Sequence, residues 1–502
     1  MRSKKALLNV STALIFQLIV IVCGLIIPRL IIGTFGSEVH GVVASITRFL
    51  AYITFLELGI TVTMRTALYK PLADGDRVAM GDVLSFAQNY YRRIALVFIL
   101  YVVLLATFFP LLGADVLSYT EIFVLVLVMS VGTFFHYYLG LASRLLLDAD
   151  QRSYIVFGLD ALGMLVQTFA ILIAVTLGAG IHVVKFLPFS VVAIVSAIMY
   201  AYVKSNYKLG KDVKKSTSKI ENRWAGTWLQ TSIVVIEMTP VTVLTLLTNF
   251  KEVSVYIVYN LVIISIRKMV GTITQGFESA LGSMIAKKEF ELLGRSFKLY
   301  ELMVHLVIGI VLSSTSFLIL PFVALYTAGI ADIDYIRPAF AQLLIIAVWL
   351  YCARLPYRSV IVTSGSFKEL TKSIKLEILI NISVSVVAVF FLGLAGVALG
   401  SIAAVGFQLL NFVFYLSKRI LNRSVVHFIR RCLVSAIAIT GTLAILHSLP
   451  LWEVYSYVDW VKTAILAVGV STIITGSVNA VFYTREMHDI YKRVKAVFIR
   501  RA

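Results

Sequence analysis

Long apolar segments separated by short polar ones run along the whole chain of 502 residues. A helix needs about 20 mostly apolar residues to cross about 30 Å of hydrocarbon, and about fourteen segments meet this requirement. We place them at 8–32, 40–66, 90–112, 120–143, 154–177, 183–203, 225–249, 253–285, 299–325, 338–363, 374–393, 396–417, 432–450 and 460–483. The pattern predicts an all-α polytopic membrane protein.

The basic residues are unevenly distributed between the polar segments. Most of the 45 Lys and Arg residues fall in the two tails and in alternate loops, whereas acids such as Asp115, Asp332 and Glu453 occupy the other loops. The few basic residues on the side of the membrane where these acidic loops lie are Arg29, Lys185, Lys251, Arg337 and Lys462. Because positive loops stay in the cytoplasm, we expect both termini to be cytoplasmic.

Composition supports this class and excludes others. Hydrophobic residues make up 60% of the chain and charged residues 14%, whereas soluble proteins are about half apolar and a quarter charged. The net charge of +19 would suit nucleic acid only on a soluble domain, so no nucleic-acid partner is expected. The three cysteines lie in apolar segments and the seven histidines lack metal-binding spacing, so we expect neither a metal nor a cofactor.

The chain shows weak self-similarity at an offset of 214 to 215 residues, typical of duplicated transporter halves. Leu30–Phe35 before Glu38-Val39 aligns with Leu246–Phe250 before Glu252-Val253, and Leu177-Gly178 aligns with Leu392-Gly393. The offset corresponds to six helices, an even number, so equivalent helices of the two halves cross the membrane in the same direction. Two parallel six-helix lobes are therefore predicted. The predicted parts are an N-lobe at 1–204, a basic cytoplasmic linker at 205–223, a C-lobe at 224–419, and an extra helix pair with a basic C-terminal tail at 420–502.

The span at 253–285 carries a polar stripe. At 3.6 residues per turn, Asn260, Arg267, Thr274 and Glu278 fall on one face, with Arg267 and Glu278 about 20° apart. The rise between these two is about 16 Å, so they cannot pair directly. Such a stripe faces other helices or a water-filled cavity, and we expect it to line a cavity. Lys268 points about 100° away, so it is expected either to line a neighbouring wall of the cavity or to make a contact between helices.

Two more cations inside the predicted spans are candidates for binding an anion. A charge near the centre of a bilayer is costly unless it faces protein or water. Arg48 and Arg354 lie deep enough to be cavity residues, whereas Arg358 is close enough to the cytoplasmic end to snorkel out.

Acids inside the spans are candidates for coupling or gating. Glu237 lies three residues before Pro240, which frees a backbone carbonyl, so it is a candidate proton or cation site. The alternatives are a neutral core residue or a partner of Arg267. Glu57 and Arg65 lie on one side of a helix and could form an inner gate, and Glu278 is a further gating candidate.

The N-terminal region resembles a known family. Pro28-Arg-Leu-Ile-Ile-Gly-Thr-Phe-Gly36, then Glu38-Val-His-Gly41, resembles the first two helices of bacterial O-antigen and polysaccharide flippases. Phe55-Leu-Glu-Leu-Gly-Ile60 with Arg65 and Asp74-Gly-Asp76 is similar to the end of their second helix. This family belongs to the multidrug/oligosaccharidyl-lipid/polysaccharide exporter superfamily.

The resemblance implies a transporter that carries out no covalent chemistry. It implies a bacterial cytoplasmic (inner) membrane location, a central cavity lined by spans one, two, seven and eight, and alternating access coupled to a proton or sodium gradient. The implied cargo is an undecaprenyl-pyrophosphate-linked oligosaccharide for lipopolysaccharide, and the implied partners are membrane lipids and polysaccharide polymerases or glycosyltransferases. Arg267, Arg48 and Arg354 would bind the pyrophosphate, since Arg offers paired donors to phosphate oxygens.

Two rival functions remain open. A cation-coupled drug antiporter of the same superfamily would need acids to dominate its cavity, whereas bases outnumber the clearly central acids Glu57, Glu237 and Glu278 here. A membrane glycosyltransferase or ligase would need a sizeable extramembrane loop with catalytic acids or histidines, and the polar loops here are short.

Overall fold

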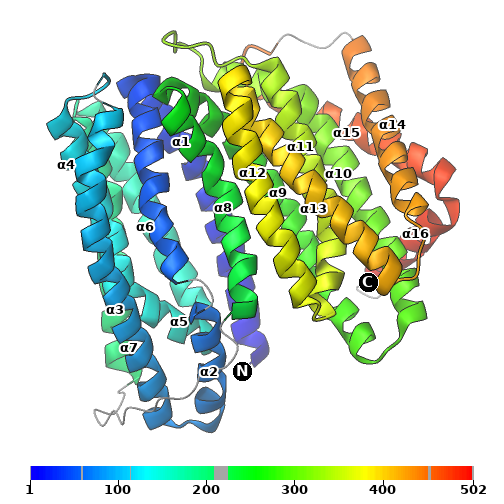
Figure 1. Cartoon of the computed structure of the whole chain (residues 1–502), viewed down its shortest axis with the longest axis horizontal. Coiled ribbons are helices and arrows are strands. Elements are labelled where there is room, and N and C mark those ends of the chain that lie inside the picture. Colours follow the sequence, from blue (N-terminus) through cyan, green and yellow to red (C-terminus); the bar gives the residue numbers. More distant parts are fainter. Residues whose placement is uncertain (1, 58–59, 114, 208–223, 450–453, 500–502) are drawn as a thin grey trace. The chain divides into compact units, whose positions relative to one another are not determined.

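The computed structural model describes residues 2–57, 60–113, 115–207, 224–449 and 454–499. In these ranges the chain is helical and contains no strand (Figure 1). The first elements are α1 (Arg2–Ala51), η1 (Tyr52–Leu56), α2 (Ile60–Asp74), α3 (Arg77–Phe108), η2 (Phe109–Leu112), α4 (Tyr119–Phe135), the π-helical turn η3 (His136–Gly140), α5 (Leu141–Ala149), α6 (Ser153–Thr176) and α7 (Ile181–Tyr207). The later ones are α8 (Trp224–Leu247), α9 (Phe250–Ala286), α10 (Phe290–Tyr326), α11 (Pro338–Thr363), α12 (Phe367–Leu392), α13 (Leu394–Arg419), α14 (Val426–Ser448), α15 (Tyr457–Phe482) and α16 (Thr484–Ile499).

The described helices match the predicted spans, which confirms the all-α polytopic fold class. Within the described ranges, 12 helices are long and apolar enough to cross a membrane. The first of them, Leu8–Leu56, contains the predicted span 8–32 and the first part of the predicted span 40–66, whose end lies in α2. The predicted seventh span corresponds to α8, whose apolar part Val234–Leu247 is shorter.

Glycine separates those first two spans. Gly36 has φ 83° and ψ 170°, a conformation that a residue with a Cβ rarely adopts, and it kinks α1 there. Gly178 and Gly393, which the sequence repeat aligns, also have positive φ values, of 72° and 53°. Both follow the end of a long helix, so the two positions that the predicted repeat aligns have a similar local structure.

Polar residues fix the start of other helices. Asp76 accepts hydrogen bonds from the N–H groups of Val78 and Ala79, both at 3.0 Å, before α3 begins. Ser118 and Glu121 form a capping box at the start of α4. These side chains satisfy N–H donors that have no partner within the helix.

The helices group into two compact units, Met1–Ser254 and Val255–Ala502. In the first unit, α1 packs against α6 and α4 packs against α7. The core of this unit includes Ile46, Tyr91, Phe98, Leu125 and Leu146, all at most 1% exposed. Of the predicted linker, residues 208–223 lie outside the described ranges, and the division into repeated lobes stays a prediction.

In the second unit, α13 packs closely against both α12 and α11, and α10 packs against α11 and α15. Gly396 and Gly400 face α12 so closely that a Cβ at either would overlap with its neighbours, the backbone at Ala388 and the side chain of Ser385. The close approach places polar side chains of these helices within reach of one another. It thereby forms the surroundings of Arg354.

Candidate functional site

Arg267 lies on α9 and is half-buried. Its guanidinium carbon is 4.8 Å from the centroid of the Tyr351 ring on α11, a cation–π contact. Its Nε is buried and has no hydrogen-bond partner. Among the described residues, no carboxylate lies within ion-pair distance of Arg267.

Two other residues of the predicted stripe are more deeply buried than Arg267. Asn260 is 8% exposed and Thr274 is 3% exposed, and Thr274 donates its hydroxyl hydrogen to the carbonyl of Gly271 at 2.7 Å. Glu278 accepts a hydrogen bond from Ser359 of α11 at 3.0 Å. Lys268 is exposed on another side of the helix. The stripe therefore faces protein at Asn260 and Thr274, while Arg267 remains partly open.

Arg354 lies in a buried polar cluster. It is 4% exposed, forms an ion pair with Glu377 of α12, and donates to the side-chain oxygen of Gln408 on α13. Gln408 in turn donates to the second oxygen of Glu377. The guanidinium of Arg354 also lies 4.9 Å from the centroid of Tyr351. Two arginines thus contact one tyrosine ring, and Arg354 pairs with a carboxylate, whereas Arg267 has no carboxylate partner among the described residues.

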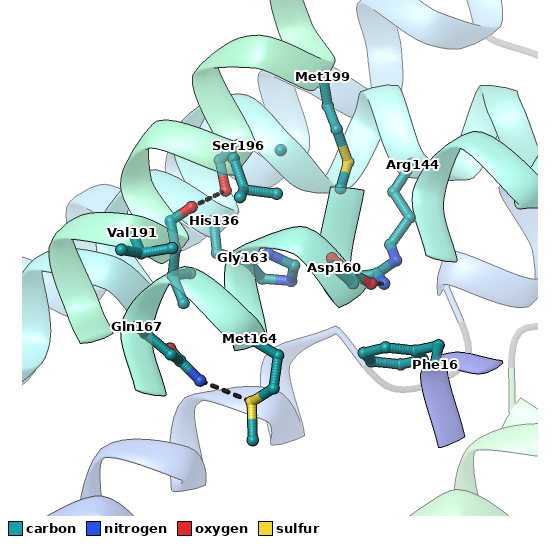
Figure 2. A pocket seen from close by; sticks show the side chains of 13 residues that line it. Phe16, His136, Arg144, Asp160, Gly163, Met164, Gln167, Val191, Ser196 and Met199 are labelled. Atoms are coloured by element: carbon teal, nitrogen blue, oxygen red, sulfur yellow. Dashed lines mark hydrogen bonds and ion pairs between the residues drawn. The ribbon is translucent and has the colours of Figure 1, made fainter. Parts of the chain in front are cut away.

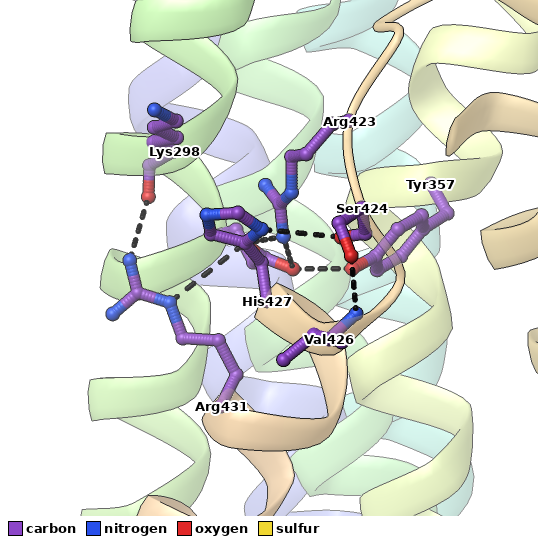
Figure 3. A network of polar contacts seen from close by, with 8 residues as sticks. Lys298, Tyr357, Arg423, Ser424, Val426, His427 and Arg431 are labelled. Atoms are coloured by element: carbon purple, nitrogen blue, oxygen red, sulfur yellow. Dashed lines mark hydrogen bonds and ion pairs between the residues drawn. The ribbon is translucent and has the colours of Figure 1, made fainter. Parts of the chain in front are cut away.

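A second buried acid, Glu301 of α10, was missed by sequence analysis. It is 0% exposed and accepts hydrogen bonds from the hydroxyl of Tyr357 and from Arg423, the latter at 2.8 and 3.0 Å. Arg431 lies 3.7 Å from the same carboxylate and also donates to the carbonyl of Lys298 (Figure 3). A carboxylate inside an apolar segment is the signal that could have identified both Glu301 and Glu377.

The predicted residues of the first unit are not joined to one another. Arg48 is half-buried and makes no ion pair with another described residue. Glu57 interacts with the hydroxyl of Tyr137. No ion pair joins Glu57 to Arg65 in the described ranges. Glu237 is exposed on α8, before the buried Pro240, and likewise has no ion-pair partner there.

Polar contacts line the packing of α1 against α8 and the start of α9. Ser45 and Thr245 hydroxyl oxygens are 2.6 Å apart, and the hydroxyls of Tyr52 and Thr242 are also 2.6 Å apart. His40 contacts Ser254 at 2.8 Å. These contacts are neutral, so water can replace each partner at a modest free-energy cost.

A cavity of about 280 Å³ lies within the first unit (Figure 2). Its wall combines apolar side chains of α7 with His136 of the η3 turn, the Arg144–Asp160 ion pair and Gln167. Figure 2 shows the His136 ring beside Gly163 and the ion pair. Sequence analysis did not identify this cavity, because its polar residues come from separate helices.

Comparison with solved structures identifies chains with a similar fold, whereas no protein-family model and no curated protein matches. The structure "Lipid II flippase MurJ, inward closed conformation" has a TM-score of 0.66 and 14% identity, and the match covers 95% of this chain and 99% of that one. An inward-facing multidrug resistance MATE family transporter of the MOP superfamily also has a TM-score of 0.66 and 14% identity, covering 80% and 94%. An outward-facing one has a TM-score of 0.59 and 12% identity, covering 83% and 95%. The chain therefore has the polytopic fold of these transporters.

Proposed function

We propose that this protein is a flippase, not an enzyme, that moves an undecaprenyl-pyrophosphate-linked oligosaccharide from the cytoplasmic to the outer leaflet of a bacterial cytoplasmic membrane. It works by alternating access, and both termini are cytoplasmic. Three observations support this function: the fold, the excess of Lys and Arg in alternate loops, and the cations inside the apolar segments. The O-antigen assignment rests on the N-terminal resemblance.

The observation that carries the proposal is that Arg267 has no carboxylate partner in the described part of the chain. A cation inside a membrane segment costs several kcal/mol unless water or an anion solvates it. Arg267 has an aromatic partner but no carboxylate among the described residues, and it is only half-buried. A pyrophosphate would supply the missing negative charge, and its oxygens match the paired donors of a guanidinium.

The remaining charges take separate roles in this mechanism. Arg48 and Lys268 have no ion-pair partner in the described ranges and remain candidates for phosphate contact. Arg354 is neutralised by Glu377, so it supports the site instead of competing for cargo. Glu237, which is exposed, is the candidate site for a coupling proton or sodium ion.

The second candidate function is a cation-coupled drug antiporter, because two of the solved structures are multidrug transporters. The additional acids Glu301 and Glu377 do not favour it, since each already binds arginine. Purified protein in proteoliposomes would separate the two functions. We expect it to translocate a fluorescent undecaprenyl-pyrophosphate-linked oligosaccharide and not to accumulate ethidium. Ethidium transport without lipid translocation would establish the antiporter instead.

A further inference from the structure

We propose that Tyr351 positions Arg267 for binding of a pyrophosphate, and that Glu377 controls cargo release by neutralising Arg354, which contacts the same ring. This inference rests on the proposed function. It assigns roles to Tyr351, Glu377 and Gln408, none of which the sequence singled out.

The contact with Tyr351 limits how Arg267 can bind an anion. The ring lies 4.8 Å from the guanidinium carbon, so the ring holds the charged group by a cation–π contact. The Nε atom is buried and has no hydrogen-bond partner in the described part of the chain. A guanidinium held in this way can present two parallel N–H bonds to phosphate oxygens.

The second cation at the ring explains the role of Glu377. Arg354 lies 4.9 Å from the same centroid, so two guanidinium groups contact one ring. Their like charges repel each other where water is scarce. Glu377 and Gln408 both bind Arg354, and the carboxylate of Glu377 offsets its charge. Arg358 of the same helix also interacts electrostatically with Arg354 and Glu377, so the surroundings of Tyr351 stay positively charged.

A partly offset positive charge suits a transporter, which must release its cargo as well as bind it. A site in which Arg354 had no counter-charge would hold a pyrophosphate more tightly and would release it more slowly. Glu377→Gln should therefore strengthen binding of the pyrophosphate and slow transport. If Glu377 had a purely structural role, Glu377→Gln would lower both the affinity for pyrophosphate and the rate of transport.

The test is a double-mutant cycle with undecaprenyl pyrophosphate as the probe, its binding measured on protein in nanodiscs. Tyr351→Phe keeps the aromatic ring and should bind within about twofold of the wild type, while Tyr351→Leu should bind roughly tenfold more weakly. In an Arg267→Ala background, Tyr351→Leu should cause no further loss, because the two residues act as a unit. Tyr415→Leu is the matched control, a half-buried tyrosine of α13 that stacks with no arginine among the described residues.

The outcomes separate this inference from the proposed function. If the wild type does not bind the probe, the proposed function fails. If binding depends on Arg267 but Tyr351→Leu weakens it equally with and without Arg267, only the positioning role fails.

Glu377→Gln leaves Arg354 buried without a counter-charge and can misfold. The Arg354→Gln/Glu377→Gln double variant removes both charges, and its binding should return close to that of the wild type. Tightened binding in that double variant would contradict the role of Glu377.

Discussion

The Nδ1 atom of His40 lies 2.8 Å from the Oγ atom of Ser254, and these two residues are separated by 214 positions, the offset of the predicted repeat. The predicted repeat therefore aligns two residues that contact each other. Ser45 with Thr245 and Tyr52 with Thr242 continue this row of contacts, which joins α1 and η1 to α8 and the start of α9. Because these contacts are neutral and short, they can form and break during the proposed transport cycle.

Cross-linking this row should arrest transport. With the three native cysteines replaced by alanine, Ser45→Cys and Thr245→Cys should form a disulfide on oxidation, since the two native hydroxyl oxygens are 2.6 Å apart. Transport in proteoliposomes should stop after oxidation and return after reduction, while each single variant should be insensitive. Undiminished transport in a fully cross-linked sample would show that α1 and α8 do not separate.

Removing the charge of Glu301 should destabilise the protein. Glu301→Gln leaves Arg423 and Arg431, whose side chains are 10% and 5% exposed, without their counter-charge. Breaking a buried ion pair in this way costs about 3–5 kcal/mol. The measurement is thermal unfolding in detergent, where Tm should fall clearly.

The control for Glu301 lies on the same helix. Glu291 pairs with Arg295 at 2.7 Å, but both side chains are largely exposed. Exposed pairs contribute little, so Glu291→Gln should leave Tm nearly unchanged. Equal effects of the two substitutions would contradict the structural role of Glu301.

Neutralising Glu237 should uncouple transport from the ion gradient. Glu237→Gln cannot exchange a proton or a cation, yet it leaves the buried contacts of the helix intact because the side chain is exposed. We expect uphill transport to be lost and binding of undecaprenyl pyrophosphate to be retained. Gradient-driven transport at the wild-type rate in proteoliposomes would remove Glu237 from the coupling role.

The helices could be predicted from sequence because a membrane span is a local signal of length and polarity. The kink at Gly36 likewise follows from one residue type at the end of an apolar segment. The predicted basic tail contains α16, where Met487 and Ile490 pack against a small apolar cluster. Their three-residue spacing is a helical signal that the net charge of the segment obscured.

The partners of the buried charges could not be predicted in the same way. Arg354 donates hydrogen bonds to Glu377 and Gln408, which lie on two other helices, 23 and 54 positions away in sequence. No local pattern specifies such a pair, because helix packing decides which faces meet. For the same reason, the contact of Arg267 with Tyr351 depends on how α9 and α11 pack. The sequence identified Arg267 as a cation inside a membrane span, but it did not indicate that Tyr351 would contact it.

The most direct test of the account is translocation of undecaprenyl-pyrophosphate-linked oligosaccharide by Arg267 variants in proteoliposomes, normalised to folded protein. Arg267→Ala should lower the rate at least about tenfold, since a hydrogen bond to a charged group contributes about 1.5–3 kcal/mol. Arg267→Glu should abolish translocation, and Arg267→Lys should restore it only partly, because lysine lacks the paired donors. Wild-type rates in the Ala and Glu variants, or restoration of the Ala variant by a second change at a partner acid such as Glu237, would show that Arg267 does not bind the cargo.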